Sequence, residues 1–218
     1  MSTFFEQLGA QTASTRADFL AIPQLQRGAA GTISHATYVA FLGQAYHHVK
    51  HTVPLLMACG GRLPERLEWL RSAVGEYIEE EMGHQEWILS DIEACGEDKE
   101  AVRRSMPLPA TELMVSYAYD TIHRSNPVGF FGMVFVLEGT SIRLALDAAE
   151  AIQDSLGLPD KAFTYLKSHG ALDVGHMGFF EELVNRLDRD EDRQAVVHAA
   201  RMFFRLYGDI FRSLPLDD

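Results

Sequence analysis

The sequence predicts an all-α protein, one compact bundle of about seven helices. Proline and glycine divide the chain into segments that are too long for strands. Within these segments apolar residues recur at intervals of three and four, the period of a helix with one buried face. Hydrophobic residues make up 47% of the 218 residues, and no long linker or low-complexity tract interrupts them. We therefore expect a single domain, residues 1–218.

Three helices are expected in the first part of the chain. The first covers residues 3–21, where apolar positions repeat with helical spacing. The second begins at Ser34, a good N-cap residue, and extends to about residue 58, before a Gly-Gly pair. Pro64 suits the first turn of the third helix, whose apolar pattern continues to Gly96.

Four more helices are expected in the rest of the chain. A shorter helix follows the segment PLPATELM and ends before Asn126 and Pro127, and this proline can open the next helix, residues 128–156. The segment LGLPDK interrupts the pattern, and the sixth helix then covers residues 159–187. The seventh covers residues 191–212.

Charge and cysteine content exclude several classes of partner. The formal net charge of −12 and the isoelectric point near 5.1 oppose binding to phosphate backbones, so nucleic acid is not expected. Cys59 and Cys95 are too few for a disulfide framework and are expected as free thiols. The N-terminal residues lack the charged and apolar regions of a signal peptide, and no window is apolar enough to span a membrane. We expect a soluble, cytoplasmic protein.

Three possible metal ligands share one face of the expected sixth helix. His169, Asp173 and His176 lie at positions i, i+4 and i+7 of the stretch LKSHGALDVGHMGFFEELV. At ~100° per residue, Asp173 projects ~40° to one side of His169 and His176 ~20° to the other. Their neighbours on this strip are apolar: Ala162, Tyr165, Phe180 and Leu183. A buried, unpaired carboxylate costs several kcal/mol, and a divalent cation removes that cost. The alternative is a partly exposed helix edge with a His–Asp hydrogen bond.

Glu81 occupies a position of the third helix where the pattern requires an apolar residue. In YIEEEMGHQEW, His84 follows three residues later, so the two side chains can reach the same point. The E-x-x-H spacing alone is a weak signal, because glutamate and histidine are common enough to produce it by chance. The alternative is a solvated acidic face, which suits Glu79, Glu80 and Glu86 better than Glu81.

Glu138 enters the expected core on the fifth helix. The segment 126–137 carries no charge. Glu138 shares an apolar stripe with Phe131, Phe135, Ile142 and Ala145. A carboxylate in such a place must be bound to something, and the alternative to a metal is an ion pair with an arginine such as Arg143.

Three helices thus direct three carboxylates and three imidazoles inward, an inventory that suits two metal ions. Mixed histidine and carboxylate ligands favour iron or manganese over zinc with thiolates or calcium with all-oxygen ligands. Ferritin-like di-iron bundles use two E-x-x-H motifs and two further glutamates. This chain departs from that pattern, because Ser141 stands three residues after Glu138.

These residues resemble the haem-oxygenase-like di-iron oxidases and oxygenases, relatives of the TenA and PqqC proteins with a seven-helix fold. The family motif has E-x-x-H on one core helix, a lone glutamate on a later one and H-x3-D-x2-H on a third. The matching positions are in the same order along this chain: Glu81, His84, Glu138, His169, Asp173 and His176. The resemblance therefore covers the chain from the third helix to the sixth.

The resemblance implies an enzyme that activates dioxygen at a labile di-iron centre. It implies two iron ions, with manganese as a possible substitute, and no haem, flavin or nicotinamide. Family members oxidise small organic acids, amino acids or amines by desaturation, chain cleavage, N-oxygenation or decarboxylation, and the motif does not choose among these. We also expect a homodimer.

The substrate pocket is expected beside the metals, with a mostly apolar wall formed by Tyr46, Phe131 and Phe135. His47 and His51 lie ~100° or more from the apolar stripe of the second helix, so we expect them at the surface or at an interface. The alternative is a role next to the metal site or the substrate.

Five other functions are alternatives to the di-iron enzyme. A metal-free TenA-like hydrolase requires a nucleophilic cysteine in the cavity. Cys59 and Cys95 each adjoin a glycine at a helix end, so neither is expected there. A PqqC-like oxidase is the second metal-free alternative. Haem oxygenase requires a proximal histidine on the first helix, and the first histidine is His35. A mononuclear iron enzyme could use the H-x3-D-x2-H face alone, and a non-catalytic metal-binding bundle would need the same ligands.

Overall fold

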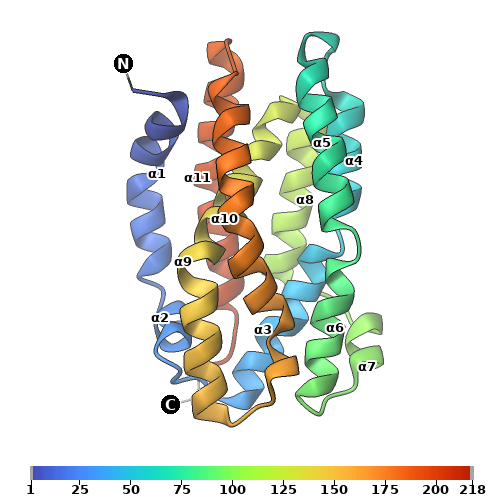
Figure 1. The fold of residues 1–218 in the computed structure, drawn as a ribbon, viewed down its shortest axis with the longest axis vertical. Coiled ribbons are helices and arrows are strands. Elements are labelled where there is room, and N and C mark those ends of the chain that lie inside the picture. The colour runs from blue at the N-terminus through green and yellow to red at the C-terminus, as the bar shows by residue number, and fades with distance from the viewer. Residues whose placement is uncertain (1, 217–218) are drawn as a thin grey trace.

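The fold is all-α in a computed structural model that describes residues 2–216, without the side chains of residues 141–144 and 169–175. This part of the chain forms eleven α-helices, three short 3₁₀ segments and no strand, and Figure 1 shows most of the helices aligned along one axis. The α-helices are α1 (Phe4–Leu20), α2 (Pro23–Ala29), α3 (His35–Val49), α4 (Thr52–Arg62), α5 (Glu68–Glu81), α6 (His84–Ala94), α7 (Lys99–Arg104), α8 (Pro109–Arg124), α9 (Phe131–Leu156), α10 (Thr164–Asn185) and α11 (Asp190–Arg212). The 3₁₀ segments are η1 (Glu65–Leu67), η2 (Pro127–Phe130) and η3 (Asp160–Ala162).

The prediction of about seven helices was too low, because two of the expected long helices are broken. The expected helix 34–58 consists of α3 and α4, since Pro54 has no N–H to donate and, in a continuous helix, its ring would clash with the carbonyl of Lys50. The expected helix 64–96 is broken at Gly83, whose φ of 94° lies in the left-handed region. The short helices α2 and α7 lie where no helix was expected, because segments of this length are too short to show a helical period.

Helix α9 lies at the centre of the bundle, where it packs against both α10 and α11. The crossing with α11 depends on Gly132: a Cβ at this position would lie 2.5 Å from the backbone nitrogen of Ala200. Figure 1 shows α9 passing from the lower half of the bundle into its middle. A residue on α9 can therefore face several other helices.

Two clusters of buried side chains form the core. The larger one joins α1, α4, α5, α8, α9, α10 and α11 and includes Leu8, Tyr77, Val136 and Phe180. The smaller one joins α3, α6, the second half of α9 and the start of α10 and includes Leu42 and Ile88. The arrangement leaves room for a cavity where the two clusters meet.

Within the described residues, no single helix is long and apolar enough to cross a membrane. The bent pair Pro127–Thr140 and Ala145–Leu156 meets the test of length and composition only when its two segments are taken together. Val136 and Ala149, one in each segment, are fully buried inside the protein.

Candidate metal centre

Glu81 and His84 flank the break between α5 and α6. Glu81 continues the buried face of α5 that carries Val74 and Tyr77, and only 8% of its surface is exposed. His84 is the first residue of α6, and its Nδ1 lies 3.1 Å from Oε2 of Glu81. The two residues therefore reach the same point as predicted, but from two helices and not from one.

Glu138 and His176 bring two more helices to this point. Glu138 on α9 is 9% exposed and His176 on α10 is 7% exposed. The Nδ1 atom of His176 lies 3.8 Å from Oε1 of Glu138. One ligand atom from each of Glu81, Glu138 and His176 lies within 4.8 Å of the other two. Helices α5, α9 and α10 thus contribute one side chain each to a buried cluster.

The chemistry of this cluster suits a metal cation. Two carboxylates a few ångströms apart in a buried place repel each other, and each loses hydration that must be replaced. A divalent cation accepts an oxygen from each carboxylate and a nitrogen from the imidazole, and this mixed set suits iron or manganese. The described residues therefore fit a metal ion at the position where the sequence predicts one.

The cluster holds three of the six predicted ligands, and His84 borders it through its contact with Glu81. The side chains of His169 and Asp173 lie outside the described residues, as does that of Arg143, the alternative partner of Glu138. Their participation remains a prediction.

Glu80 is a neighbour of the cluster that the sequence did not indicate. Its Oε2 lies 3.0 Å from Nε2 of His176, although 52% of its side chain is exposed. From the sequence, a solvated acidic face suited Glu80 better than Glu81. The contact exists because α10 lies beside the end of α5, and no local pattern encodes that.

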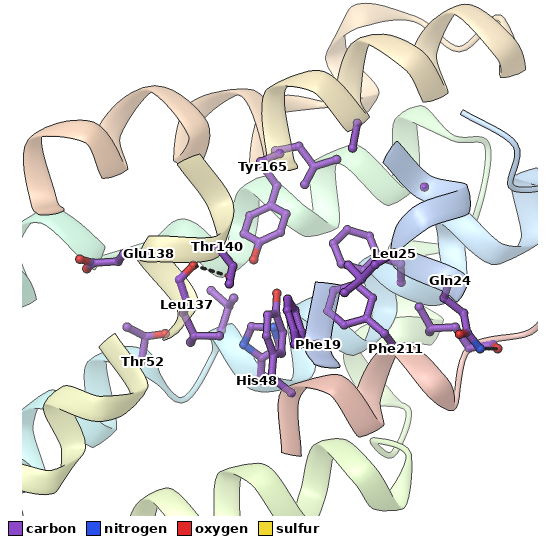
Figure 2. A pocket seen from close by; sticks show the side chains of 18 of the residues that line it. Phe19, Gln24, Leu25, His48, Thr52, Leu137, Glu138, Thr140, Tyr165 and Phe211 are labelled. Carbon is purple, nitrogen blue, oxygen red and sulfur yellow. Dashed lines mark hydrogen bonds between the residues drawn. The ribbon is translucent and has the colours of Figure 1, made fainter. Parts of the chain in front are cut away.

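A cavity of about 170 Å³ begins at the cluster. Glu81 and Glu138 are part of its wall, which is mostly apolar and contains members of both core clusters. Figure 2 shows Glu138 and Thr52 at one end, and Phe19, Leu25 and Phe211 toward the other. A single bound water needs roughly 10–15 Å³ of such space, so the cavity is large enough for a small organic molecule.

The wall of this cavity differs from the predicted one. Tyr46, Phe131 and Phe135 are buried, but none of them is among the described residues that line the cavity. Phe135 packs instead against the rings of Phe180 and Phe204, on another side of α9. Residues three and four positions apart share a helix face, but residues 131–136 at the start of α9 are all buried, so the apolar stripe alone does not identify the side that meets the cavity.

On α3, too, the apolar stripe did not identify the residue that lines the cavity. The ring of Tyr46 contacts the ring of His47, with centroids 5.3 Å apart. His48, which the sequence analysis did not single out, lines the cavity, and its ring meets that of Tyr207 edge-on. Figure 2 shows His48 and Tyr165 in the middle of the cavity, between its two ends.

The prediction that His47 lies at the surface or at an interface was wrong. His47 is 2% exposed, because the segment after α7 covers it. Its Nε2 donates to the hydroxyl of Ser105 at 2.9 Å, and its Nδ1 accepts from Lys50 at 3.1 Å. Burial, and then the nearby charge of Lys50, lower the pKa of His47 to about 4. His51 is half-buried and its Nδ1 lies 3.2 Å from the hydroxyl of Tyr119, so both imidazoles have structural contacts away from the cluster.

The sequence matches a family model described as an iron-containing redox enzyme over residues 39–208, more than half of the 218-residue chain. All six predicted ligands lie within this match. A comparison with curated proteins finds no match.

Solved structures share the fold over nearly the whole chain. A domain of unknown function with a heme oxygenase-like fold from Shewanella denitrificans has a TM-score of 0.85 and 26% identity, over 95% of this chain and 90% of that one. A TenA homologue from Pseudomonas syringae has a TM-score of 0.74 and 14% identity, over 97% and 93%. Heme oxygenase-1 from the cyanobacterium Synechocystis, solved in complex with heme, has a TM-score of 0.75 and 10% identity, over 97% and 91%. The fold is therefore haem-oxygenase-like, and the identities to the last two proteins show the fold alone.

Proposed function

The chain belongs to the family of iron-containing redox enzymes, and from this premise we propose that it is a non-haem di-iron oxidase or oxygenase. It uses dioxygen to oxidise a small organic acid, amino acid or amine, and manganese is a possible substitute for iron. The observation that carries the proposal is the buried cluster of Glu81, Glu138 and His176 at one end of an apolar cavity.

The chain offers enough ligands for two ions. Glu81, Glu138 and His176 form the described part of the centre, and His84 lies against Glu81. His169 and Asp173 complete the set that the sequence motif predicts. When bound, two iron ions supply the electrons that reduce dioxygen, without an organic cofactor.

The mostly apolar wall of the cavity orients the substrate. Four polar side chains in its wall donate hydrogen bonds to backbone carbonyls: Gln24, Thr37, Tyr38 and Thr140. No lysine or arginine is among the described residues of the wall. A charged group far from the metal end would therefore lose its hydration without gaining an opposite charge. The substrate places its polar group at the cluster and an apolar body toward Phe19, Leu25 and Phe211.

The structure gives the other functions less support. Burial raises the pKa of Cys59 to about 12 and that of Cys95 to about 11, and both thiols are buried and free, so neither suits the nucleophile of a hydrolase. The first histidine, His35, begins α3, and its Nε2 lies 2.9 Å from the backbone oxygen of Cys95. This contact occupies the ring nitrogen that a haem iron would require, and it favours a centre without haem.

Anaerobic titration with Fe(II) tests the metal centre. We expect wild-type protein to bind about two equivalents and Glu138→Gln to bind fewer, because the substitution removes one charged ligand with little change in shape. Glu79→Gln is the matched control: Glu79 is exposed on the same helix as Glu81, and this variant should bind iron like the wild type.

Exposure of the Fe(II)-loaded protein to dioxygen then tests the activity. We expect dioxygen uptake with about two irons oxidised for each dioxygen consumed. Binding of about one equivalent, with Glu81→Ala still binding it, would instead support a mononuclear centre. Two bound equivalents with no uptake of dioxygen would support a metal-binding protein without catalysis.

A further inference from the structure

His176 links the buried cluster to a carboxylate outside it. On one side of the imidazole ring, Nδ1 faces Glu138 at 3.8 Å; on the other side, Nε2 lies 3.0 Å from Oε2 of Glu80. The His176 side chain is 9% exposed, and that of Glu80 is 52% exposed. The ring therefore stands between the centre and the surface, with a carboxylate facing each nitrogen.

An imidazole that binds a metal through one nitrogen keeps its proton on the other. That N–H needs an acceptor, and a carboxylate acceptor fixes the tautomer, holds the ring in one orientation and makes the ligating nitrogen more basic. We propose that Glu80 is a positioning residue that accepts the Nε2 proton of His176 and thereby directs Nδ1 toward the metal. The inference rests on the proposed metal centre and adds to it a residue that is not among the six predicted ligands.

Glu80 and Glu81 can act on opposite sides of His176 because both lie at the end of α5. Consecutive residues of a helix point ~100° apart, so Glu80 and Glu81 leave the same turn in different directions. Glu81 points into the cluster, whereas Glu80 approaches His176 from the outer side. Glu79, the preceding residue, is exposed. Three adjacent glutamates therefore have three different surroundings, and only one of them meets the outer nitrogen of His176.

Substitutions of Glu80 test this role, with anaerobic Fe(II) titration against a competing chelator as the measurement. Glu80→Ala should lower iron affinity about 10–100-fold, the usual effect of losing such an acceptor, while the number of bound equivalents at saturation stays the same. Glu80→Gln keeps a weaker acceptor of the same length, so its effect should be smaller. Glu79→Gln should match the wild type.

Two further measurements separate positioning from a structural role. The unfolding temperature of the metal-free protein should be nearly the same in all these variants, because the side chain of Glu80 is 52% exposed and a contact with so exposed a carboxylate contributes little to stability. The visible spectrum of the Co(II)-loaded protein should change in Glu80→Ala and not in Glu79→Gln, because the orientation of a ligating ring alters the ligand field.

Unchanged iron affinity in Glu80→Ala would overturn the inference. Loss of a whole equivalent at saturation, as expected for His176→Ala, would also overturn it, because Glu80 would then be a ligand itself. If wild-type protein binds no Fe(II), the proposed metal centre fails, and that result is distinct from either outcome for Glu80.

Discussion

Glu81 and Glu138 occupy positions where a carboxylate contributes little to the stability of the metal-free protein. Both are buried, their oxygens share a cluster, and both line a mostly apolar cavity. Such an arrangement lowers stability unless a cation is bound, so it indicates a functional constraint on these positions.

The first prediction concerns this cost. Glu138→Gln should stabilise the metal-free protein by about 1 kcal/mol, because it removes the repulsion between two nearby buried carboxylates. In a domain of this size that corresponds to a rise of roughly 2–4 °C in the unfolding temperature, measured in the presence of a chelator. With Fe(II) added, the order should reverse, since only the wild type gains the full binding energy. A less stable metal-free variant would contradict the prediction.

His47 gives a prediction about pH. Its pKa is lowered to about 4 in the folded protein, because burial opposes the charge and the nearby ammonium of Lys50, which donates a hydrogen bond to Nδ1, repels a second positive charge. The unfolded imidazole takes up a proton near pH 6.5. The unfolded state therefore binds more protons between these values, and the free energy of unfolding falls as the pH drops from 6.5 toward 4.

Between pH 6.5 and pH 4, the free energy of unfolding should fall by up to about 3 kcal/mol less in His47→Gln than in the wild type. Urea denaturation at several values between pH 4 and 7.5 measures it. His198→Gln is the control, because His198 is an exposed imidazole on α11 and should leave the slope as in the wild type. Equal slopes in the two variants would show that His47 does not cause the effect.

At the level of helices, the approach of α9 to α11 determines where Glu138 lies. A Cβ on Gly132 would lie 2.5 Å from the nitrogen of Ala200 and 2.7 Å from the oxygen of Val196. Both atoms belong to the backbone, so the two helices would have to move apart. Gly132 therefore fixes the distance between the helix that carries Glu138 and its neighbour.

Gly132→Ala should lower the free energy of unfolding by about 1–3 kcal/mol, because overpacking outweighs the better helix propensity of alanine. Gly75 on α5 is the matched control: it is exposed, and a Cβ there would meet nothing within 4 Å. Gly75→Ala should stabilise the protein by up to about 1 kcal/mol. Chemical denaturation of both variants measures the change in the free energy of unfolding. A change of the same sign in both variants would contradict the prediction.

At the level of the whole molecule, the cavity is formed by residues from distant parts of the chain. Phe19 and Leu25 come from the N-terminal helices, Glu138 from α9 and Phe211 from α11. The apolar end and the acidic end therefore form only when the entire bundle is assembled. A homodimer remains a prediction, and sedimentation velocity would show it as a species of twice the 24.4 kDa of one chain.

The two ends of the cavity give a prediction about substrates. Octanoate and 8-aminooctanoate have the same length and differ in the charge at the far end. Calorimetry with anaerobic, Fe(II)-loaded protein should show at least about tenfold tighter binding of octanoate, because the ammonium would be desolvated without a partner. Leu25→Glu supplies a carboxylate at that end and should narrow the difference. Equal binding of both compounds by the wild type would contradict an apolar far end.

Much of the metal centre could be predicted from sequence because its signal is local. An ionisable residue at an apolar position of a helical pattern must be buried, and Glu81, Glu138 and His176 all stand in such positions and all are buried. The helix start at Ser34 was also predictable, because an N-cap residue acts within one turn. These features depend on residues three or four apart.

Tertiary structure alone decided which side of each helix meets which neighbour. Glu80 contacts His176 because α10 lies beside the end of α5, and His47 is buried because the segment after α7 covers it. Tyr46 and Phe135 are as buried as predicted, yet other side chains line the cavity. The periodicity of a helix fixes the direction of each side chain relative to its own axis, whereas contacts between helices depend on how loops and close approaches such as Gly132 orient those axes.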